Sequence, residues 1–545
     1  MEKLREDGKK SIKSIVSRWF LPVGFSLLFS ACMIFGSSLE KRGSVTFTSP
    51  LLWLKIVVLT FIVTLAVKFL WGILNGISVS WTQVSGHTYS QRQMRRTFVL
   101  TAVLIFLCYM PVFLAVYPGF FVYDAQDELM QVVTRNFSTH HPLLHVLLMG
   151  GIVQAGYKIT GSYNIGIAFY TLFQMAVLSC IFSWCICRLK REGMGKIGRT
   201  IAALYFGFYP VVVMFVLCSA KDGLFSGMLL AMVMVLRQWQ AEGKFDRKEL
   251  ILFSVTAVFM MLLRHNGFYA FVVFAVLVFR KKKLFWAAGA AACYLLISSG
   301  LTFVFQADDS EHQELLTVPI QQMARVYGTE KDLLPENEKL TLYEILPEEA
   351  LVRYTPKISD GVKMSFDNEA YGKEPRKYIK LWFSWGIRHP FTYLNAWLMT
   401  SYGFWYPGAI IDVYKGNTMF TFTYGDSSYF GFEVEEPGKR YSFLPWLEEV
   451  YRSISLDVVW QKIPVISLLF SPGFLFWVTA FALGFFFYTG KKERAIPYIL
   501  PLLVWCTVLL GPTYLVRYVV FWWFFLPVLC FDLIIRGNCD ILTKA

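Results

Sequence analysis

Long apolar runs alternate with short polar segments along most of the chain, and this pattern predicts helices that cross a membrane. Runs of about 17 to 25 apolar residues are long enough to span a hydrocarbon core about 30 Å thick. Because the runs are continuously apolar and do not alternate with a period of two, they exclude the strands of a transmembrane barrel. The expected fold is an all-α polytopic membrane protein, with a thirteenth crossing near 391–406 as an alternative to twelve. The twelve predicted spans are residues 19–36, 51–74, 97–117, 163–187, 200–218, 223–237, 249–263, 267–280, 284–305, 463–487, 495–511 and 513–535.

Composition and charge narrow the class of protein further. Of 545 residues, 56% are hydrophobic and only 17% are charged, and the mean hydropathy is +0.48. These values exclude a soluble globular protein and a disordered chain. The net charge of +14 comes from short basic blocks between the apolar runs, so it indicates membrane topology and predicts no nucleic-acid partner.

An apolar stretch at 141–158 decides the predicted topology. If it crossed the membrane, the basic loop at 188–199 would lie outside, against the rule that basic loops stay in the cytoplasm. If it lies along the outer interface or re-enters, every basic block is cytoplasmic, including the N-terminal tail, 91–96, 243–248, 280–283 and 491–494. We adopt this second arrangement, with both termini cytoplasmic and a short span at 141–158 as the alternative.

The topology divides the chain into four parts. Residues 1–96 form a cytoplasmic tail and two extra spans, and residues 97–305 form a transmembrane core that contains an exterior loop at 118–162. Residues 306–462, in which acidic residues outnumber basic ones, form a mostly helical extracytoplasmic domain, and 463–545 form the last spans. The domain is rich in Trp and Tyr toward its end, which is typical of helices lying at a membrane interface.

The first exterior loop carries the strongest candidates for chemistry. Asp124 and Asp127 are three residues apart and share a face on a helical turn, which suits a general base beside a second carboxylate or a ligand of a divalent cation. The alternative is that Asp124 only caps a short helix. His140 and His141 follow, and the spacing of His141 and His145 is compatible with zinc, although a polar anchor at the helix start is the alternative.

Three further exterior segments carry polar residues at the ends of predicted spans. Lys221 and Asp222 lie between two spans, and Asp222 would cap the next helix in the structural alternative. A lysine at a helix N-terminus opposes the helix dipole by roughly 0.3 to 1 kcal/mol, which a bound anion near Lys221 would offset. Arg264 and Asn266 occupy a tight turn, and Arg517 lies at the outer end of the last span. Arginines at such ends can also simply extend toward water.

Together these residues predict an anion site at one membrane surface. The spans carry almost no ionisable residues near the bilayer midplane, which counts against an ion-coupled transporter. A substrate linked to a lipid phosphate would present its phosphate at headgroup depth, where lysine and arginine can stabilise it as a leaving group. A carboxylate would take the proton from an acceptor hydroxyl that attacks the sugar carbon.

The order of these motifs resembles a known class of enzymes. The segments YPGFFVYD, HHPLLH, SAKDG, RHNG, VPIQQMARVY and GFWYP, within 97–430, are similar to the GT-C class of integral-membrane glycosyltransferases, and specifically to a related bacterial multi-pass family of unassigned substrate. In that class an acidic residue lies in an early exterior loop, followed by a proline stretch, which here would be Asp124 with Asp127 and then His140, His141 and Pro142. The chain departs from the class in having Asp124-Ala125 in place of Asp-Glu and a single proline.

The resemblance implies an inverting transferase of the bacterial cytoplasmic membrane with an extracytoplasmic active site. Its donor would be a polyprenyl-phosphate sugar, and its acceptor a cell-envelope glycan, lipid or protein. We predict Asp124 as the base, Asp127 as its support or an optional cation ligand, and Asp222 as the group that orients the acceptor. Alternatives are a lipid-linked oligosaccharide flippase and an enzyme resembling O-antigen polymerases and ligases. The predicted substrate-binding residues are His140, His141, Lys221, Asp222, Arg264, Asn266 and Arg517.

Overall fold

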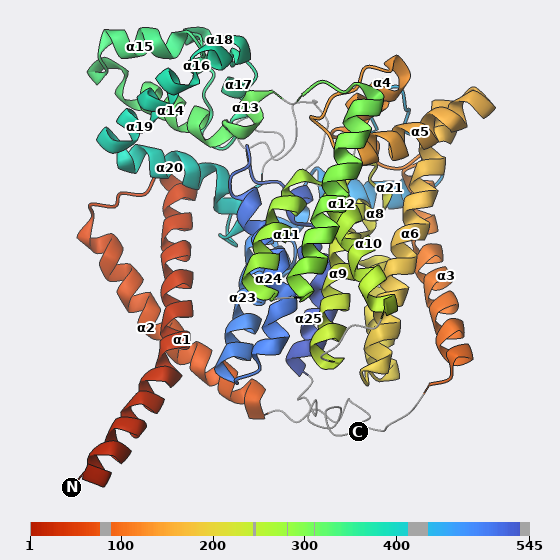
Figure 1. The fold of residues 1–545 in the computed structure, drawn as a ribbon, viewed down its shortest axis with the longest axis horizontal. Coiled ribbons are helices and arrows are strands. Elements are labelled where there is room, and N and C mark those ends of the chain that lie inside the picture. Colours follow the sequence, from red (N-terminus) through yellow and green to blue (C-terminus); the bar gives the residue numbers. More distant parts are fainter. Residues whose placement is uncertain are drawn as a thin grey trace.

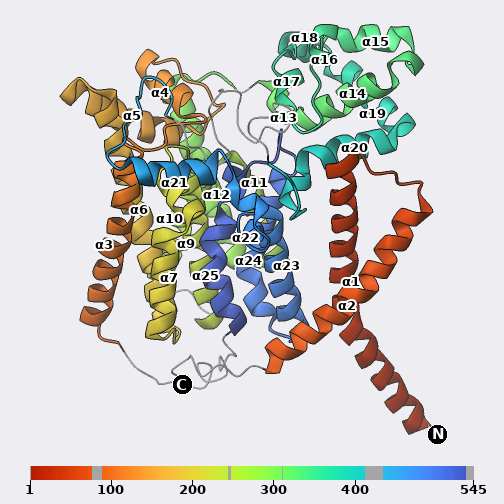
Figure 2. The ribbon, with the colours of Figure 1, turned by 180° about the vertical axis from the view of Figure 1, so that it is seen from behind.

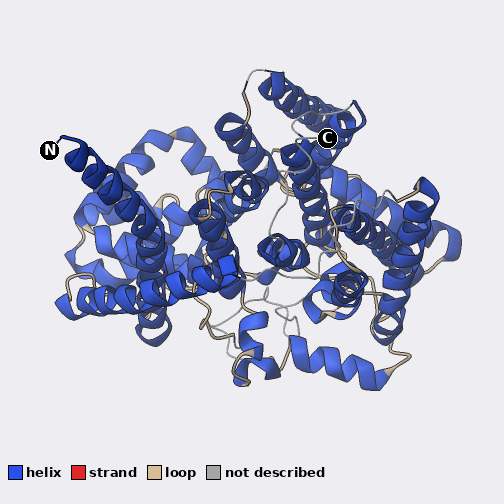
Figure 3. Ribbon diagram, turned by 90° about the horizontal axis from the view of Figure 1, so that it is seen from below, coloured by secondary structure: helices blue, strands red, loops and turns tan. Residues whose placement is uncertain are grey.

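The computed structural model describes residues 2–76, 89–242, 247–280, 282–309, 311–411 and 434–534. Within these ranges the chain consists of helices and connecting loops, and the only β contacts are isolated bridges (Figure 3). The predicted all-α class is therefore confirmed. The physical cause is that a backbone crossing lipid must satisfy its hydrogen bonds within each segment, which a helix does.

In the part of the chain that the structure describes, seven helices are long and apolar enough to cross a membrane, so the protein is a helical membrane protein. An eighth span is added if the bent pair Lys196–Phe208 and Pro210–Leu217 counts as one. Each of the twelve predicted spans contains a helix, but the number of actual crossings stays a prediction. The seven helices are Trp19–Arg42, Pro50–Gly76, Gln91–Ala115, Leu143–Thr160, Tyr163–Arg191, Lys283–Phe305 and Val516–Ile534.

Most of the apolar helices run side by side in one bundle, and α1 and α2 stand beside it (Figures 1 and 2). One extensive hydrophobic core joins them, with Trp71 of α2 among its wholly buried side chains. The helices are α1 (Glu2–Arg42), α2 (Pro50–Gly76), α3 (Gln91–Ala115), α6 (Tyr163–Arg191), α7 (Lys196–Phe208), α8 (Pro210–Leu217), α9 (Asp222–Glu242), α10 (Arg247–Leu263), α11 (His265–Val278), α12 (Lys282–Phe305), α22 (Ile466–Leu469), α23 (Pro472–Tyr488), α24 (Lys492–Val508) and α25 (Phe521–Ile534), with short 3-10 turns η4 (Val459–Lys462) and η5 (Val516–Val519).

Two predicted spans differ from the helices observed, and proline explains both differences. The span at 200–218 is broken by 54° between α7 and α8, where Tyr209 is extended and Pro210 starts a new helix. The span at 463–487 begins its main helix only at Pro472. Proline lacks the N–H that an ongoing helix needs, but it suits the first helical turn.

One end of the bundle carries further helices, and this end holds the candidate site. Three of them lie across the bundle end: α4 (Ala125–Thr134), α5 (Leu143–Thr160) and α21 (Pro445–Ser455). By length and composition α5 qualifies as a span. In both side views, however, it lies across the end of the bundle beside α4 (Figures 1 and 2). The interfacial position of 141–158 stays a prediction.

A separate group of helices at the same end has its own hydrophobic core. Trp385 is fully buried in it, among Ile320, Ala324 and Val326. Helix α1 begins and α25 ends at the opposite end of the bundle (Figure 1). The group comprises α13 (His312–Leu315), α14 (Thr317–Glu330), η1 (Lys331–Leu333), α15 (Glu336–Tyr343), α16 (Glu348–Leu351), α17 (Asp360–Lys363), α18 (Asn368–Lys373), α19 (Pro375–Arg388) and α20 (Pro390–Ser401). The turn η2 (Tyr402–Phe404) that follows α20 packs in the core of the bundle.

Candidate functional site

The loops that follow α3 and α8 pair with each other and bring the start of α4 to the start of α9. The N–H of Phe120 donates to the carbonyl of Leu217 at 3.0 Å, and the N–H of Ser219 donates to the carbonyl of Phe120 at 2.8 Å. Gly119 has φ +119, and a Cβ there would lie 2.4 Å from the Thr171 hydroxyl of α6. Any larger residue at this position would be strained and would push the loop away from α6.

Asp124 is the centre of a buried ion-pair network. Arg517 grips its carboxylate with two bonds, from Nη1 to Oδ1 at 3.1 Å and from Nη2 to Oδ2 at 2.6 Å. Lys221 Nζ donates to the same Oδ2 at 2.5 Å. Asp124 precedes α4 but makes no capping hydrogen bond with its side chain, so the interpretation of Asp124 as a simple helix cap is wrong.

A second carboxylate, Asp222, joins two arginines from separate segments, Arg264 between α10 and α11 and Arg517 in η5. It is fully buried, and it accepts from Arg264 Nη1 at 2.7 Å and from Arg517 Nε at 2.9 Å. The guanidinium of Arg517 also lies over the Tyr123 ring, 4.4 Å from its centre, in a cation–π contact. Both arginines therefore point into the protein, and their interpretation as side chains extending toward water is wrong. Helix α9 begins at Asp222 itself, not after it.

Glu128 extends the network into the core of the bundle. Its Oε1 lies 3.3 Å from Lys221 Nζ, and its Oε2 bonds to Nδ1 of His145. His145 Nε2 then meets the Tyr170 hydroxyl at 2.9 Å, and that hydroxyl donates to Gln174 at 3.0 Å. Both ring nitrogens of His145 are thus occupied, which makes it a polar anchor and excludes the predicted pairing with His141 on zinc.

Sequence reasoning missed Glu128, Tyr170 and Gln174. Glu128 lies four residues after Asp124, which places both on one face of a helical turn, and this spacing was the available signal. Tyr170 and Gln174 lie inside the apolar run of α6, and their spacing of four was the corresponding signal there. Nothing local distinguishes such polar residues from ordinary buried side chains.

Three predicted site residues lie outside the network. Asp127 is exposed and lines a surface pocket of about 300 Å³ together with Asp308. His140 is exposed and packs edge-on against His141. Asn266 donates to the Thr507 hydroxyl at 3.0 Å and ties α11 to α24. Asp127 is therefore not part of the ion-pair network, in which Glu128 shares Lys221 with Asp124, although the charge of Asp124 still acts on Asp127.

The charges of the network set the protonation of its members. Burial alone would raise the pKa of Asp124, but Arg517 and Lys221 hold it well below its usual range. Burial likewise opposes ionisation of Glu128, yet His145 and Lys221 lower its pKa to about 2. Burial and Lys221 lower the pKa of His141 to about 3, so this ring is neutral at pH 7. Its Nδ1 accepts from Lys221 at 3.4 Å, which leaves the proton on Nε2.

The predicted divalent cation does not fit the arrangement of these groups. Ligand atoms of Asp124, Glu128 and His141 lie within 4.8 Å of one another, so the cluster differs from the expected Asp124 and Asp127 pair. The ammonium of Lys221 already contacts all three groups. A metal ion there would have to displace a buried lysine and would meet its repulsion.

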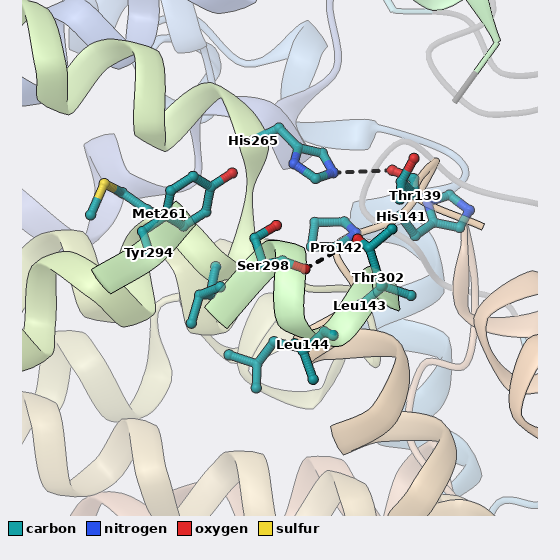
Figure 4. A pocket seen from close by; sticks show the side chains of 12 residues that line it. Thr139, His141, Pro142, Leu143, Leu144, Met261, His265, Tyr294, Ser298 and Thr302 are labelled. Atoms are coloured by element: carbon teal, nitrogen blue, oxygen red, sulfur yellow. Dashed lines mark hydrogen bonds between the residues drawn. The ribbon is translucent and has the colours of Figure 1, made fainter. Parts of the chain in front are cut away.

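A small cavity of about 40 Å³ adjoins His141 between α5, α11 and α12 (Figure 4). His265 borders it and meets the Thr139 carbonyl at 3.2 Å. A cavity of this size holds about one water molecule. Its lining is mainly apolar, and α12 is the least buried of the candidate spans, with 11% of its apolar window inside the protein.

Fold and site together define a polytopic helical membrane protein with a buried network of carboxylates and cations at one end of its bundle. The chain belongs to the family described as "Family of unknown function (DUF6020)", whose sequence pattern matches residues 131–540. The match includes His141, Lys221, Arg264 and Arg517, whereas Asp124 precedes it. No curated protein matches the chain, and no solved structure matches it.

The depressed pKa of Glu128 predicts a specific pH dependence of stability. The unfolded chain binds the proton at its usual pKa of 4.5 and the folded protein only near 2, so this stabilisation is present above pH 4.5 and is lost as the pH falls toward 2. At about 1.4 kcal/mol per pKa unit it is on the order of 3 kcal/mol. We expect Glu128→Gln to be less stable than wild type at pH 7, with the gap narrowing toward pH 3.

Thermal unfolding of the detergent-solubilised protein at several pH values measures this gap. Glu349→Gln is the matched control, because Glu349 is an exposed glutamate of the second helical group. A difference in stability between Glu128→Gln and wild type that stays constant from pH 7 to pH 3 would contradict the lowered pKa of Glu128.

Proposed function

We propose that the protein is a GT-C-like glycosyltransferase that moves a sugar from a polyprenyl-phosphate carrier to a cell-envelope acceptor. The reaction would take place at the extracytoplasmic face of a bacterial cytoplasmic membrane, at the end of the bundle that carries α4 and α5. The observation that carries the proposal is the convergence of Asp124, Lys221, Asp222, Arg264 and Arg517 from four separate segments. Their arrangement beside apolar helices supports an anionic substrate that is anchored in lipid.

The network supplies the electrostatics that a phosphate leaving group needs. Lys221, Arg264 and Arg517 are held in place by carboxylates before any substrate binds, so little reorganisation is needed during the reaction. A unit-charge pair at 4 Å interacts by about 4 kcal/mol at an effective dielectric of about 20. The neutral His141 can add a hydrogen bond from Nε2. These contacts favour departure of the carrier phosphate from the sugar.

The acceptor hydroxyl would attack the anomeric carbon from the side opposite the phosphate. The new bond to the acceptor oxygen forms while the bond between the anomeric carbon and the phosphate oxygen breaks, and the electron pair of the broken bond stays on the phosphate. The proton of the acceptor hydroxyl passes to a carboxylate of the site. Inversion at the anomeric carbon follows. We assign Asp124 mainly to positioning Arg517 and Lys221, because its low pKa makes it a weaker base than first expected.

The lipid carrier would approach from the side of α12. This helix is largely exposed, and the mainly apolar cavity behind it leads to His141 (Figure 4). Twelve crossings with cytoplasmic termini complete the proposed topology and would place the network at headgroup depth.

Reconstitution of the purified protein in liposomes with a panel of polyprenyl-phosphate sugars tests the proposal. We expect wild type to release polyprenyl phosphate from at least one donor, and Lys221→Met to lower the rate about 100-fold or more because a leaving-group cation is lost. Lys158→Met is the control, since Lys158 is exposed at the end of α5. Movement of carriers across the bilayer without sugar release would favour the flippase alternative.

A further inference from the structure

Residues 434–443 form a strip of chain that pairs with the loop leading from α3 into α4. The N–H of Glu435 donates to the carbonyl of Phe121 at 2.8 Å, and the N–H of Tyr441 donates to the carbonyl of Tyr117 at 2.8 Å. Asn164 of α6 holds the Lys439 backbone from both sides, accepting from its N–H at 2.8 Å and donating to its carbonyl at 2.7 Å. The backbone of Glu435 is therefore anchored opposite Phe121, three residues before Asp124.

The side chain of Glu435 is unlike the other carboxylates of this region. Both of its oxygens are buried and receive no side-chain hydrogen bond among the residues that the structure describes, although the backbone N–H of Tyr123 acts on the carboxyl. Asp124, Glu128 and Asp222 each bond to at least one cationic or ring nitrogen. Because a buried carboxyl without a cationic or side-chain partner costs free energy, its presence beside the network points to use by a substrate.

The surroundings of Glu435 favour its neutral form. Burial raises its pKa, and the charges of Asp127 and Asp124 raise it further, to about 8. The backbone amide of Tyr123 and the Arg517 guanidinium act in the opposite direction without cancelling the rise. A carboxyl with this pKa holds a transferred proton far better than Asp124 does, which is what a general base requires.

We propose that Glu435 is the catalytic base that takes the proton from the acceptor hydroxyl. The inference rests on the proposed function, because it assigns one step of that reaction. As the acceptor oxygen bonds to the anomeric carbon, its O–H bond breaks and the proton passes to a Glu435 oxygen. The electron pair of the broken sugar–phosphate bond leaves with the carrier phosphate, which the network stabilises. Glu435 then returns the proton to water.

This role has a definite pH signature. The active form of Glu435 is the carboxylate, so the fraction of competent enzyme rises with pH. We expect kcat/KM to increase about tenfold per pH unit below pH 8 and to level off above it. The charged groups that set this value are Asp124 just before α4, Asp127 on α4 and Arg517 in η5.

The experiment compares Glu435→Gln, Glu435→Asp and wild type in liposomes with the donor that wild type uses. Glu435→Gln should transfer sugar about 100-fold or more slowly, bind donor as tightly as wild type and lose the pH-dependent rise. Glu435→Asp keeps a carboxylate and should retain part of the rate with a shifted profile. The exposed neighbour Glu436 provides the control Glu436→Gln, which should behave like wild type.

The outcomes separate this inference from the function on which it rests. Transfer by Glu435→Gln within about threefold of wild type, with the pH profile intact, overturns the role of Glu435 and leaves the transferase standing. If Glu435→Gln does not fold, a wild-type profile that lacks the rise toward pH 8 overturns it equally. Absence of transfer by wild type with every donor contradicts the proposed function itself.

Discussion

Replacing Asp124 with asparagine should lower sugar transfer about 100-fold or more, because it removes the charge that positions two cations. Asparagine keeps the shape of the side chain, so Arg517 and Lys221 lose an ionic partner without a gap in the packing. Both cations would then repel each other and drift from the position that holds the leaving phosphate. The measurement is the transfer rate in liposomes at saturating donor, together with the donor dissociation constant.

Asp332→Asn is the matched control for this experiment. It makes the same chemical change on an exposed side chain in η1, within the second helical group and outside the network. Its rate should stay within about twofold of wild type, as for most surface substitutions. An unchanged rate in Asp124→Asn would contradict the assignment of Asp124 as the residue that positions Arg517 and Lys221. If loss of Arg264 or Arg517 still abolished activity, that pattern would favour the O-antigen polymerase or ligase alternative.

Arg517→Met should have the largest effect on stability. Arg517 is 2% exposed and bonds to Asp124 and Asp222 at once, so its removal leaves the buried Asp222 and the partly buried Asp124 short of a partner. Removing one partner of a buried ion pair typically costs about 3–5 kcal/mol, and we expect a loss of at least this order. Transfer should also fall below detection, since the same guanidinium faces the leaving group in the proposed reaction.

Chemical unfolding in detergent measures the stability change, and Arg376→Met serves as control. Arg376 lies exposed on α19 in the second helical group, so its loss should change the free energy of unfolding by less than about 0.5 kcal/mol. The stability of Arg517→Lys should lie between that of Arg517→Met and that of wild type, because lysine keeps the charge but cannot bind Asp124 with two parallel hydrogen bonds. Equal stability of Arg517→Met and wild type would show that the two carboxylates do not depend on this arginine.

Much of the helical architecture followed from the hydrophobic pattern alone. The free energy of transferring a side chain into lipid depends on that residue and its immediate neighbours. Apolar runs therefore identify helices such as α2 and α3 reliably. The same local reasoning identified Asp124, Lys221 and Arg517 as candidates. An ionisable residue at the end of an apolar run costs free energy, so its presence there indicates a function.

The pairing of those residues depended on how distant segments pack. Arg517 meets Asp124 across 393 positions of the chain, and Asp222 across 295, separations that carry no local signal. The same is true of Glu435, whose buried carboxyl looks like an ordinary loop glutamate until the strip at 434–443 docks on 114–121. Coulomb attraction, burial and proton affinity depend on distances in space, whereas hydropathy is a property of neighbours along the chain. The chain pattern therefore determined which segments enter the membrane, and the packed structure determined which charges meet and what they can do.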